Sequence, residues 1–291
     1  MKSRNFSYLR ARSLRHAFDV LAEHGDEAVP VAGGQSLLPG LNMRLSAPKL
    51  LVDIGDLAEL RGQSHANGIV RLGALTRHAE LLKSDLVKRH LPLLQQAAPH
   101  IGHVAIRNRG TLGGSLAYAD PAAELPACAV ALDATLVLGS VSGQREVKAE
   151  DFFTGLFETG LQARELIIAV NFPVQAPATR TAFAELSRRH GDFALAGLAV
   201  VASTEGSRLN KARVVYLGCA DRAKIANSVA SAVAGRTLPL RGDEAVAEAV
   251  RADLSPDDTP GLRADTRLHM ATVLTRRALN SLLEGGPHER A

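Results

Sequence analysis

The chain has 291 residues, of which 46% are hydrophobic and 22% charged, a composition typical of folded globular proteins rather than disordered or fibrous ones. The excess of 34 Lys and Arg over 30 Asp and Glu is small and spread along the chain, which argues against a nucleic-acid-binding protein. No window holds the roughly 18 consecutive apolar residues of a transmembrane helix, and the basic segment 1–15 has no apolar signal core, so we expect a cytoplasmic protein without a membrane span.

The first quarter of the chain predicts a small α/β unit. Ser13 is placed to cap an amphipathic helix, because apolar residues recur at helical spacing directly after it. A short apolar strand then runs into Gly33 and Gly34, and Ser36 is placed to cap a short helix or turn behind them. The expected elements are a helix at 13–24 and strands at 28–32, 50–54 and 69–75.

The middle of the chain predicts helices, a polar glycine loop and further strands. Pro92 and Pro99 interrupt the helical spacing of residues 76–101, so we expect two helices there. Asp120 and Pro121 have the residue types of an N-cap and a first helical position, and they predict a helix that begins at this point. Strands are expected at 134–138, around 147 and at 166–172.

The last third predicts a separate domain. Residues 175–181 contain two prolines and are the expected boundary. Three apolar segments with strand periodicity follow, and three helical segments complete the chain. These expected strands span 182–188, 195–203 and 212–217, and the expected helices span 226–234, 243–252 and 265–283.

Two glycine-rich segments carry the strongest functional signal, one at residues 32–39 and the other at residues 110–115. Paired glycines let the backbone approach a ligand closely, and successive N–H groups that point into one concavity bind anions. Two such segments suit a diphosphate better than a single phosphate. The alternative is that both are tight turns, because neither matches the dinucleotide or P-loop fingerprint.

Longer motifs around these segments resemble a known family. Residues 32–45, AGGQSLLPGLNMRL, and 107–126, RNRGTLGGSLAYADPAAELP, are similar to the FAD-binding medium subunits of the xanthine dehydrogenase and carbon monoxide dehydrogenase family of molybdenum hydroxylases. The resemblance extends to residues 188–194, RRHGDFA, and to the helix that ends in RRAL at 276–279, so it covers nearly the whole chain.

The resemblance implies an α+β fold. A two-part FAD-binding domain of the PCMH type would occupy residues 1–175, with subdomains at about 1–55 and 56–175. A C-terminal domain of a small antiparallel sheet with helices would occupy 176–291. No catalytic or metal-binding residue is implied. The implied cofactor-binding residues are Ala32, Gly33, Gly34, Gln35, Ser36, Leu37, Thr111, Leu112, Gly113, Gly114, Ser115, Glu124, Ile167 and Phe193.

In this resemblance the two loops would hold the diphosphate of FAD, and Glu124, where the family usually has Asp, would accept hydrogen bonds from flavin hydroxyl groups. Ile167 and Phe193 would lie near the flavin ring, although core packing explains each equally well. Two places depart from relatives: Ala184 and Glu185 stand where some have a lysine near the ring, and Gln35 replaces a frequent His. No motif for covalent attachment is present, so the FAD would be non-covalent.

The implied partners are a large molybdopterin subunit and a small [2Fe–2S] subunit, assembled as a dimer of heterotrimers. The chain has two cysteines, Cys128 and Cys219, which form no CxxC motif, so clusters would lie only in partner subunits. The chain would then pass electrons from the iron–sulfur subunit to an external acceptor. Two other classes remain open, a self-sufficient flavin oxidase and a non-catalytic nucleotide-binding or assembly protein.

Overall fold

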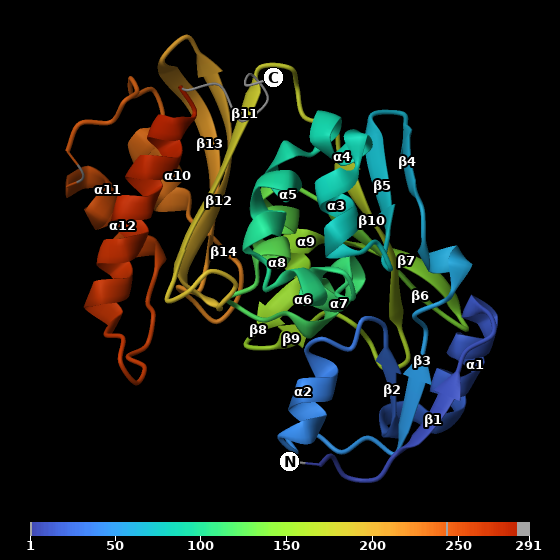
Figure 1. Ribbon diagram of the computed structural model, residues 1–291. Helices are drawn as coiled ribbons and strands as arrows, with labels where there is room; N and C mark the ends of the chain where they lie inside the picture. Colours follow the sequence, from blue (N-terminus) through green and yellow to red (C-terminus); the bar gives the residue numbers. More distant parts are fainter. Residues whose placement is uncertain (1, 243, 284–291) are drawn as a thin grey trace.

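The computed structural model describes residues 2–242 and 244–283. Figure 1 shows its layers from left to right: three C-terminal helices, a four-stranded sheet, a layer of helices and a five-stranded sheet, with a three-stranded sheet at the lower end. The expected α+β class is therefore confirmed. Within the described residues, no helix is both long and apolar enough to cross a membrane. The expected helix start at Asp243 and the segment 284–291 lie outside these residues.

The three-stranded sheet is parallel, in the order β1, β3, β2. Its edge strand β2 leads directly into the first glycine segment and α2, so this segment lies at the carboxyl end of the sheet. The Ser13 hydroxyl accepts a hydrogen bond from the His16 N–H at 3.1 Å and caps α1, as predicted. The elements are β1 (Ser7–Arg10), α1 (Leu14–His24), β2 (Ala28–Val31), α2 (Leu37–Asn42) and β3 (Leu50–Asp53), with a 3-10 turn at Gly25–Glu27.

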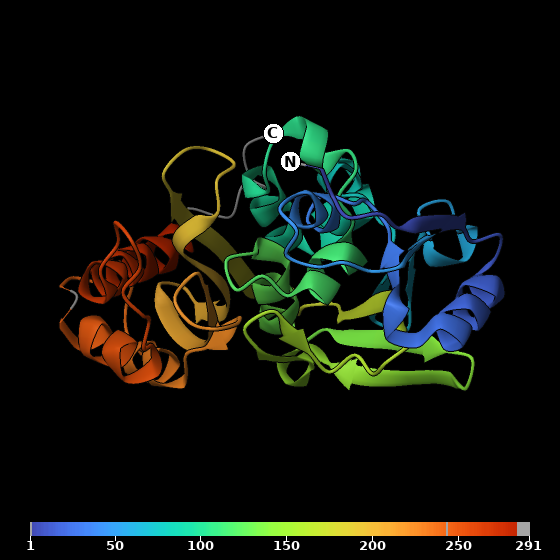
Figure 2. The same ribbon diagram turned by 90° about the horizontal axis from the view of Figure 1, so that it is seen from below.

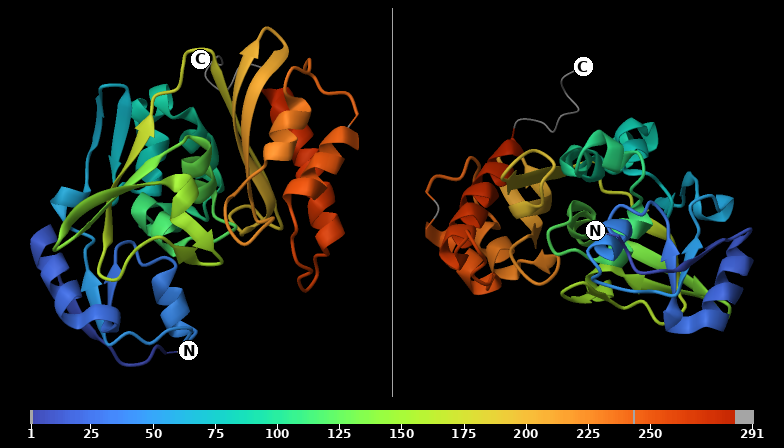
Figure 3. Two further views of the ribbon diagram at one scale, coloured as in Figure 1. Left: turned by 180° about the vertical axis from the view of Figure 1, so that it is seen from behind. Right: turned by 60° about the horizontal axis from the view of Figure 1, so that its bottom comes forward.

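The five-stranded sheet is antiparallel, in the order β4, β5, β10, β6, β7. Alternate residues of its central strands face opposite layers: Leu136 and Leu138 pack against the helices, whereas Val137 and Ile168 pack against α1 and β3 of the small sheet. The back view in Figure 3 shows this sheet above the small sheet. Its strands are β4 (Gln63–Ala66), β5 (Ile69–Gly73), β6 (Thr135–Ser140), β7 (Gly143–Lys148) and β10 (Leu166–Pro173).

The helical layer lies between the five-stranded sheet and the C-terminal sheet (Figure 1). Its members are short because prolines and glycines interrupt them. They are α3 (His78–Lys83), α4 (Asp85–His90), α5 (Pro92–Ala97), α6 (Val104–Arg107), α7 (Leu112–Tyr118), α8 (Glu124–Ala131) and α9 (Ala149–Phe152), with 3-10 turns at Ala58–Leu60 and Ala98–His100 and a small hairpin of β8 (Phe153–Gly155) and β9 (Glu158–Thr159).

The C-terminal sheet is antiparallel and has a different layer on each face. Phe183, Val201 and Val215 face the helical layer, whereas Ala182, Val200 and Val214 face the C-terminal helices, which form a separate block in Figure 2. The strands are β11 (Thr179–Ser187), β12 (Ala194–Glu205), β13 (Arg208–Leu217) and β14 (Lys224–Ile225), and the helices are α10 (Asn227–Val233), α11 (Glu244–Asp253) and α12 (Ala264–Ser281).

Four local expectations were wrong. Residues 76–101 form three helices, α3, α4 and α5, and a 3-10 turn rather than the two helices expected there. The helix expected at Asp120 begins only at Glu124, because Ala119 adopts a left-handed conformation and the Asp120 carboxylate accepts the Ala122 N–H at 2.9 Å in a turn. Ser36 precedes α2, but its side chain makes no capping hydrogen bond. The expected loop at 110–115 is in addition largely helical, since α7 begins within it.

Candidate flavin site

The first glycine segment, residues 32–37, presents unpaired backbone donors. None of the N–H groups of residues 33–37 has an acceptor among the described residues. Gly34 has φ +70°, a conformation that favours glycine, and it turns the chain from β2 towards α2. Successive unpaired N–H groups in such a turn form a binding site for an anion. The residues present therefore fit a phosphate-bearing cofactor.

The second segment, residues 110–115, uses all but one of its backbone N–H groups within the protein: that of Gly110 donates to the Ile106 carbonyl at 2.7 Å, and only that of Thr111 has no acceptor among the described residues. The Leu112 and Gly113 N–H groups donate to the Thr76 and Ala74 carbonyls at 2.9 and 2.8 Å. The N–H groups of Gly114 and Ser115 close the first turn of α7: the Gly114 N–H donates to the Thr111 hydroxyl at 3.1 Å, and the Ser115 N–H donates to the Thr111 carbonyl at 3.0 Å. This segment therefore offers a ligand its Ser115 hydroxyl rather than a row of N–H groups.

The two segments meet at Gly33. A Cβ atom added there would overlap the Arg109 carbonyl oxygen and lie 3.0 Å from the Gly110 Cα. Glycines of the second segment are needed for close packing too, because a Cβ at Gly113 would lie 2.6 Å from the Ala74 Cβ and one at Gly110 would lie 2.9 Å from the His78 ring. The fold thus brings the two predicted glycine segments together, but only the first of them leaves a row of successive donors free.

Glu124 is the first residue of α8 and is half-buried. Burial raises the pKa of its carboxyl group to about 8, and the nearby carboxylates of Glu185 and Asp120 act in the same direction. Burial also raises the pKa of Asp120. At neutral pH the Glu124 carboxyl is therefore mostly protonated, so it can donate a hydrogen bond as well as accept one.

Glu185 is a buried acid that sequence reasoning treated only as a departure from relatives. Its side chain is 3% exposed, and its Oε1 lies 3.5 Å from Nδ1 of His100, whose ring lies against Phe183. Its Oε2 has no hydrogen-bond partner among the described residues. The only signal in the sequence was an acid two positions after Phe183, on the same face of a strand.

The remaining two predicted residues differ in exposure. Ile167 lies in β10 at a register shift and is 5% exposed, so most of its surface already packs in the core. Phe193 is 73% exposed. It stands two residues after Gly191, whose backbone lies against Gly102. Phe193 is thus an aromatic side chain available to a ligand or a partner, whereas Ile167 presents little free surface.

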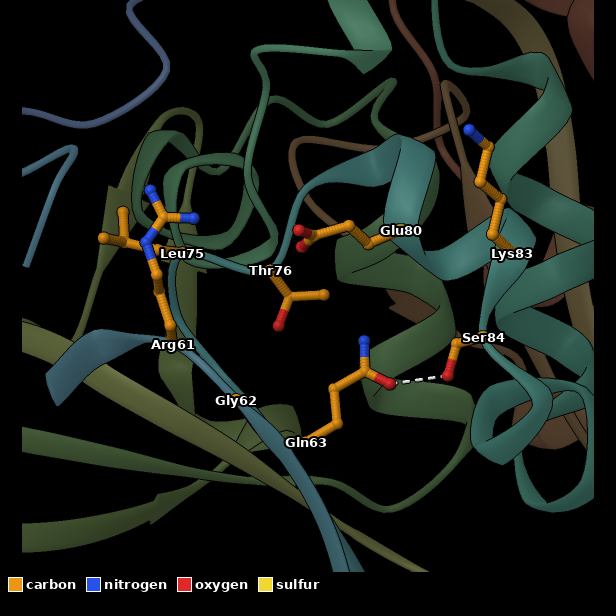
Figure 4. Close-up of a pocket in the computed structure, with 8 residues that line it drawn as sticks. All are labelled: Arg61, Gly62, Gln63, Leu75, Thr76, Glu80, Lys83 and Ser84. Carbon is orange, nitrogen blue, oxygen red and sulfur yellow. Dashed lines mark hydrogen bonds between the residues drawn. The ribbon is translucent and has the colours of Figure 1, made fainter. Parts of the chain in front are cut away.

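A separate polar hollow of about 370 Å³ adjoins the second segment and is drawn in Figure 4. The Thr76 hydroxyl points into it and has no partner among the described residues, while the Ser84 hydroxyl donates to the Gln63 amide oxygen at 2.5 Å. None of the predicted cofactor-binding residues lines it. Its lining residues are Arg61, Gly62, Gln63, Leu75, Thr76, Glu80, Lys83 and Ser84.

Comparison with protein families matches two regions of the chain. Residues 4–175 match the FAD binding domain in molybdopterin dehydrogenase, and residues 181–282 match the CO dehydrogenase flavoprotein C-terminal domain. The first match alone covers more than half of the chain.

Relatives match over almost their full length. The chain is 39% identical to the 6-hydroxypseudooxynicotine dehydrogenase complex subunit alpha of Paenarthrobacter nicotinovorans, over 97% of this chain and 96% of the relative. It is 34% identical to the carbon monoxide dehydrogenase medium chain of Hydrogenophaga pseudoflava, over 95% and 96%.

Solved structures agree with these relatives. A carbon monoxide dehydrogenase structure from Hydrogenophaga pseudoflava has a TM-score of 0.93 at 34% identity, and quinoline 2-oxidoreductase from Pseudomonas putida 86 has 0.89 at 37%, each covering 98% of this chain and 99% of the other. The chain therefore belongs to the FAD-binding medium subunits of the molybdenum hydroxylases, and it is the flavoprotein subunit of a heteromeric oxidoreductase.

Proposed function

We propose that this subunit takes electrons from an iron–sulfur subunit and passes them to an external acceptor through a non-covalently bound FAD. The observation that carries the proposal is the row of unpaired N–H groups at residues 33–37, next to the close contact between the two glycine segments. When bound, FAD accepts and releases electrons singly or in pairs, which links one-electron clusters to two-electron acceptors. The subunit binds and orients the flavin and leaves the organic substrate to another chain.

The proposed binding residues divide by role. Residues 33–37 would bind the diphosphate through backbone N–H groups, and Ser115 would add a hydroxyl group. Glu124 would bind flavin hydroxyl groups in its protonated form, which its raised pKa supports. Phe193 would cover the flavin ring, which its exposure supports. Ala32, Thr111, Leu112, Gly113, Gly114 and Ile167 would shape the site by packing, since most of them are buried.

The partners in the proposal are a large molybdopterin subunit and a small [2Fe–2S] subunit, in a dimer of heterotrimers. Their support is the near-complete match to the subunit alpha of a dehydrogenase complex and to a carbon monoxide dehydrogenase medium chain. The proposed division into residues 1–175 and 176–291 is supported by the family matches, which end at 175 and begin again at 181.

The test compares the intact complex with one stripped of flavin, in a stopped-flow instrument that follows cluster reduction and acceptor reduction separately. Without FAD, substrate should still reduce the clusters, whereas transfer to the acceptor should fall sharply. The chain alone with FAD should not oxidise the organic substrate. Turnover by the isolated chain, or loss of cluster reduction without FAD, would contradict the proposal and support a self-sufficient oxidase.

Covalent attachment is tested independently. Acid precipitation of the complex should release all flavin into the supernatant as FAD, because neither glycine segment has a residue suited to covalent linkage. Yellow colour retained in the pellet, or FMN in place of FAD, would contradict the proposed cofactor state. A purified complex with no redox-active flavin would instead support a non-catalytic role.

A further inference from the structure

Three arginines gather where the two glycine segments meet. Arg61 follows the 3-10 turn at Ala58–Leu60, Arg77 precedes α3, and Arg109 follows α6. Burial lowers the pKa of the Arg77 guanidinium and the positive charges of Arg61 and Arg109 lower it further, whereas the carboxylates of Glu80 and Asp56 act in the opposite direction. The three positive charges repel one another, and an anion bound at the cluster would relieve this repulsion.

The position of Arg77 is fixed by the backbone of the second segment. Its Nη1 donates to the Arg109 carbonyl oxygen, which is the same atom that a Cβ at Gly33 would overlap. The Arg77 guanidinium therefore lies close to Gly33, the first residue of the segment that carries the unpaired N–H groups. Its other nitrogens, and the whole Arg109 guanidinium, have no acceptor among the described residues.

Each carboxylate near the cluster accepts a hydrogen bond from, or forms an ion pair with, another group. Asp53 accepts hydrogen bonds from the Tyr8 hydroxyl and the Gly55 N–H, and Asp56 forms an ion pair with Arg10. Glu80 accepts the Arg77 backbone N–H at 2.7 Å. None of these carboxylates forms an ion pair with Arg77 or Arg109 among the described residues, so both guanidinium groups keep hydrogen-bond donors for a ligand.

Arg61 has a different orientation from the other two. Its Nη2 donates to the Gly55 carbonyl at 2.6 Å, which ties it to the turn after β3. Figure 4 shows its side chain turned away from Gln63 and Ser84, on the opposite side of the polar hollow. Arg61 therefore strengthens the positive field at Arg77 from a fixed position, while Arg77 and Arg109 keep donors for a ligand.

We propose that Arg77, together with Arg109, recognises the diphosphate of the flavin and makes the site selective for FAD over flavins that lack a diphosphate. Charge-assisted hydrogen bonds from guanidinium groups would add to the backbone donors of residues 33–37, and the dianion would relieve the repulsion among the arginines. This inference rests on the proposed FAD site and assigns to it side chains that the glycine motifs do not contain.

The test measures binding of FAD and of riboflavin to the full chain freed of flavin, with Arg77→Gln, Arg77→Lys and Arg109→Gln compared with the wild type. Arg77→Gln should weaken FAD about 10- to 100-fold and riboflavin less than about twofold, because riboflavin has no phosphate. Arg77→Lys, which keeps the charge, should recover most of that loss. Arg180→Gln, an exposed arginine on β11, is the matched control and should change neither affinity.

The salt dependence of FAD binding distinguishes recognition of the diphosphate by Arg77 from a purely structural role of this residue. In about 1 M NaCl, where charges are screened within about 3 Å, the FAD affinities of the wild type and Arg77→Gln should converge. An equal loss for FAD and riboflavin, or a loss that persists in 1 M NaCl, would show that Arg77 only supports the second segment and would overturn the inference.

Arg109→Gln keeps the carbonyl that Arg77 binds, so it remains informative if Arg77→Gln does not fold. It should weaken FAD about 3- to 10-fold at low salt, and unchanged FAD binding in this variant would overturn the pairing of the two arginines. A wild-type chain that binds neither flavin would instead contradict the proposed FAD site itself, so the two failures are distinguishable.

Discussion

The two glycine segments look alike in sequence but differ in what their backbone does. In residues 33–37 the N–H groups are free, whereas in residues 112–115 all of them donate to Thr76, Ala74 or Thr111. A Gly-Gly pair indicates that something approaches the backbone closely, but it does not distinguish a ligand from the protein's own chain. In the proposed FAD site the first segment would bind the ligand directly, and the second would hold the first in place.

The largest effect is expected at the contact between the segments. Gly33→Ala should lower FAD affinity more than about 100-fold and the free energy of unfolding by about 2 to 3 kcal/mol, because the added Cβ overlaps the Arg109 carbonyl. Flavin binding by fluorescence and thermal unfolding of the purified chain measure both. Gly40→Ala in α2 is the control, since a Cβ there meets nothing within 4 Å, and it should be neutral or slightly stabilising.

Gly113→Ala should act through packing of the protein against itself. The Cβ would lie 2.6 Å from the Ala74 Cβ, so we expect a loss of about 1 to 3 kcal/mol in stability. The double variant with Ala74→Gly removes the Ala74 Cβ but keeps the Ala74 carbonyl oxygen, which would lie 2.9 Å from the added Cβ. It should therefore recover part of the lost stability, which a double-mutant cycle measures. If Gly113→Ala lost flavin affinity with unchanged stability, the second segment would contact the ligand as directly as the first.

The region after the second segment contributes a titratable side chain, that of Glu124, to the candidate site. Its folded pKa of about 8 lies above the ordinary 4.5, so the unfolded chain loses the proton first as pH rises. The carboxyl therefore lowers stability progressively between about pH 4.5 and 8, and it has no effect below that window.

Glu124→Gln should accordingly raise the free energy of unfolding by roughly 2 kcal/mol at pH 8.5 and leave it unchanged at pH 4, after discounting for partial exposure. Thermal unfolding of the flavin-free chain at several pH values measures this difference. The exposed Glu248→Gln is the control and should show no such dependence. A constant difference between the Glu124 variant and the wild type at all pH values would contradict the raised pKa.

The smallest effects are expected when the hydroxyl groups of Ser36 in the first segment and Thr111 in the second are removed. Ser36 makes no capping bond, so Ser36→Ala should leave stability within about 0.5 kcal/mol and weaken FAD about 2- to 10-fold. Thr111 caps α7, so Thr111→Ala should lower stability by about 1 to 2 kcal/mol. Equal stability losses in the two variants, measured by chemical denaturation, would remove this distinction between the segments.

Local signals in the sequence predicted well where local bonds decide the structure. The Ser13 cap and the strand before Gly33 needed only neighbouring residues, and both are present. β1 and β4 were not predicted, because short strands with mostly exposed residues show no apolar alternation. The helix start at Asp120 failed because the left-handed Ala119 redirects the chain, which residue types alone do not reveal.

The candidate site shows the same limit. The glycine segments were visible in the sequence, but their unequal use of donors depends on Thr76 and Ala74, which lie more than 30 residues away along the chain. The burial of Glu185 and the position of Arg77 beside Gly33 also depend on packing between distant elements. Proximity across the fold, rather than residue type, decides which groups are free.

Hydrogen exchange of the chain with and without FAD tests the central contrast most directly. Without flavin, the amides of residues 33–37 should exchange fast and those of 112–115 slowly, because only the latter have acceptors in the protein. Adding FAD should slow exchange strongly in the first segment and little in the second. Strong protection of residues 112–115 by FAD, with residues 33–37 unchanged, would contradict the account.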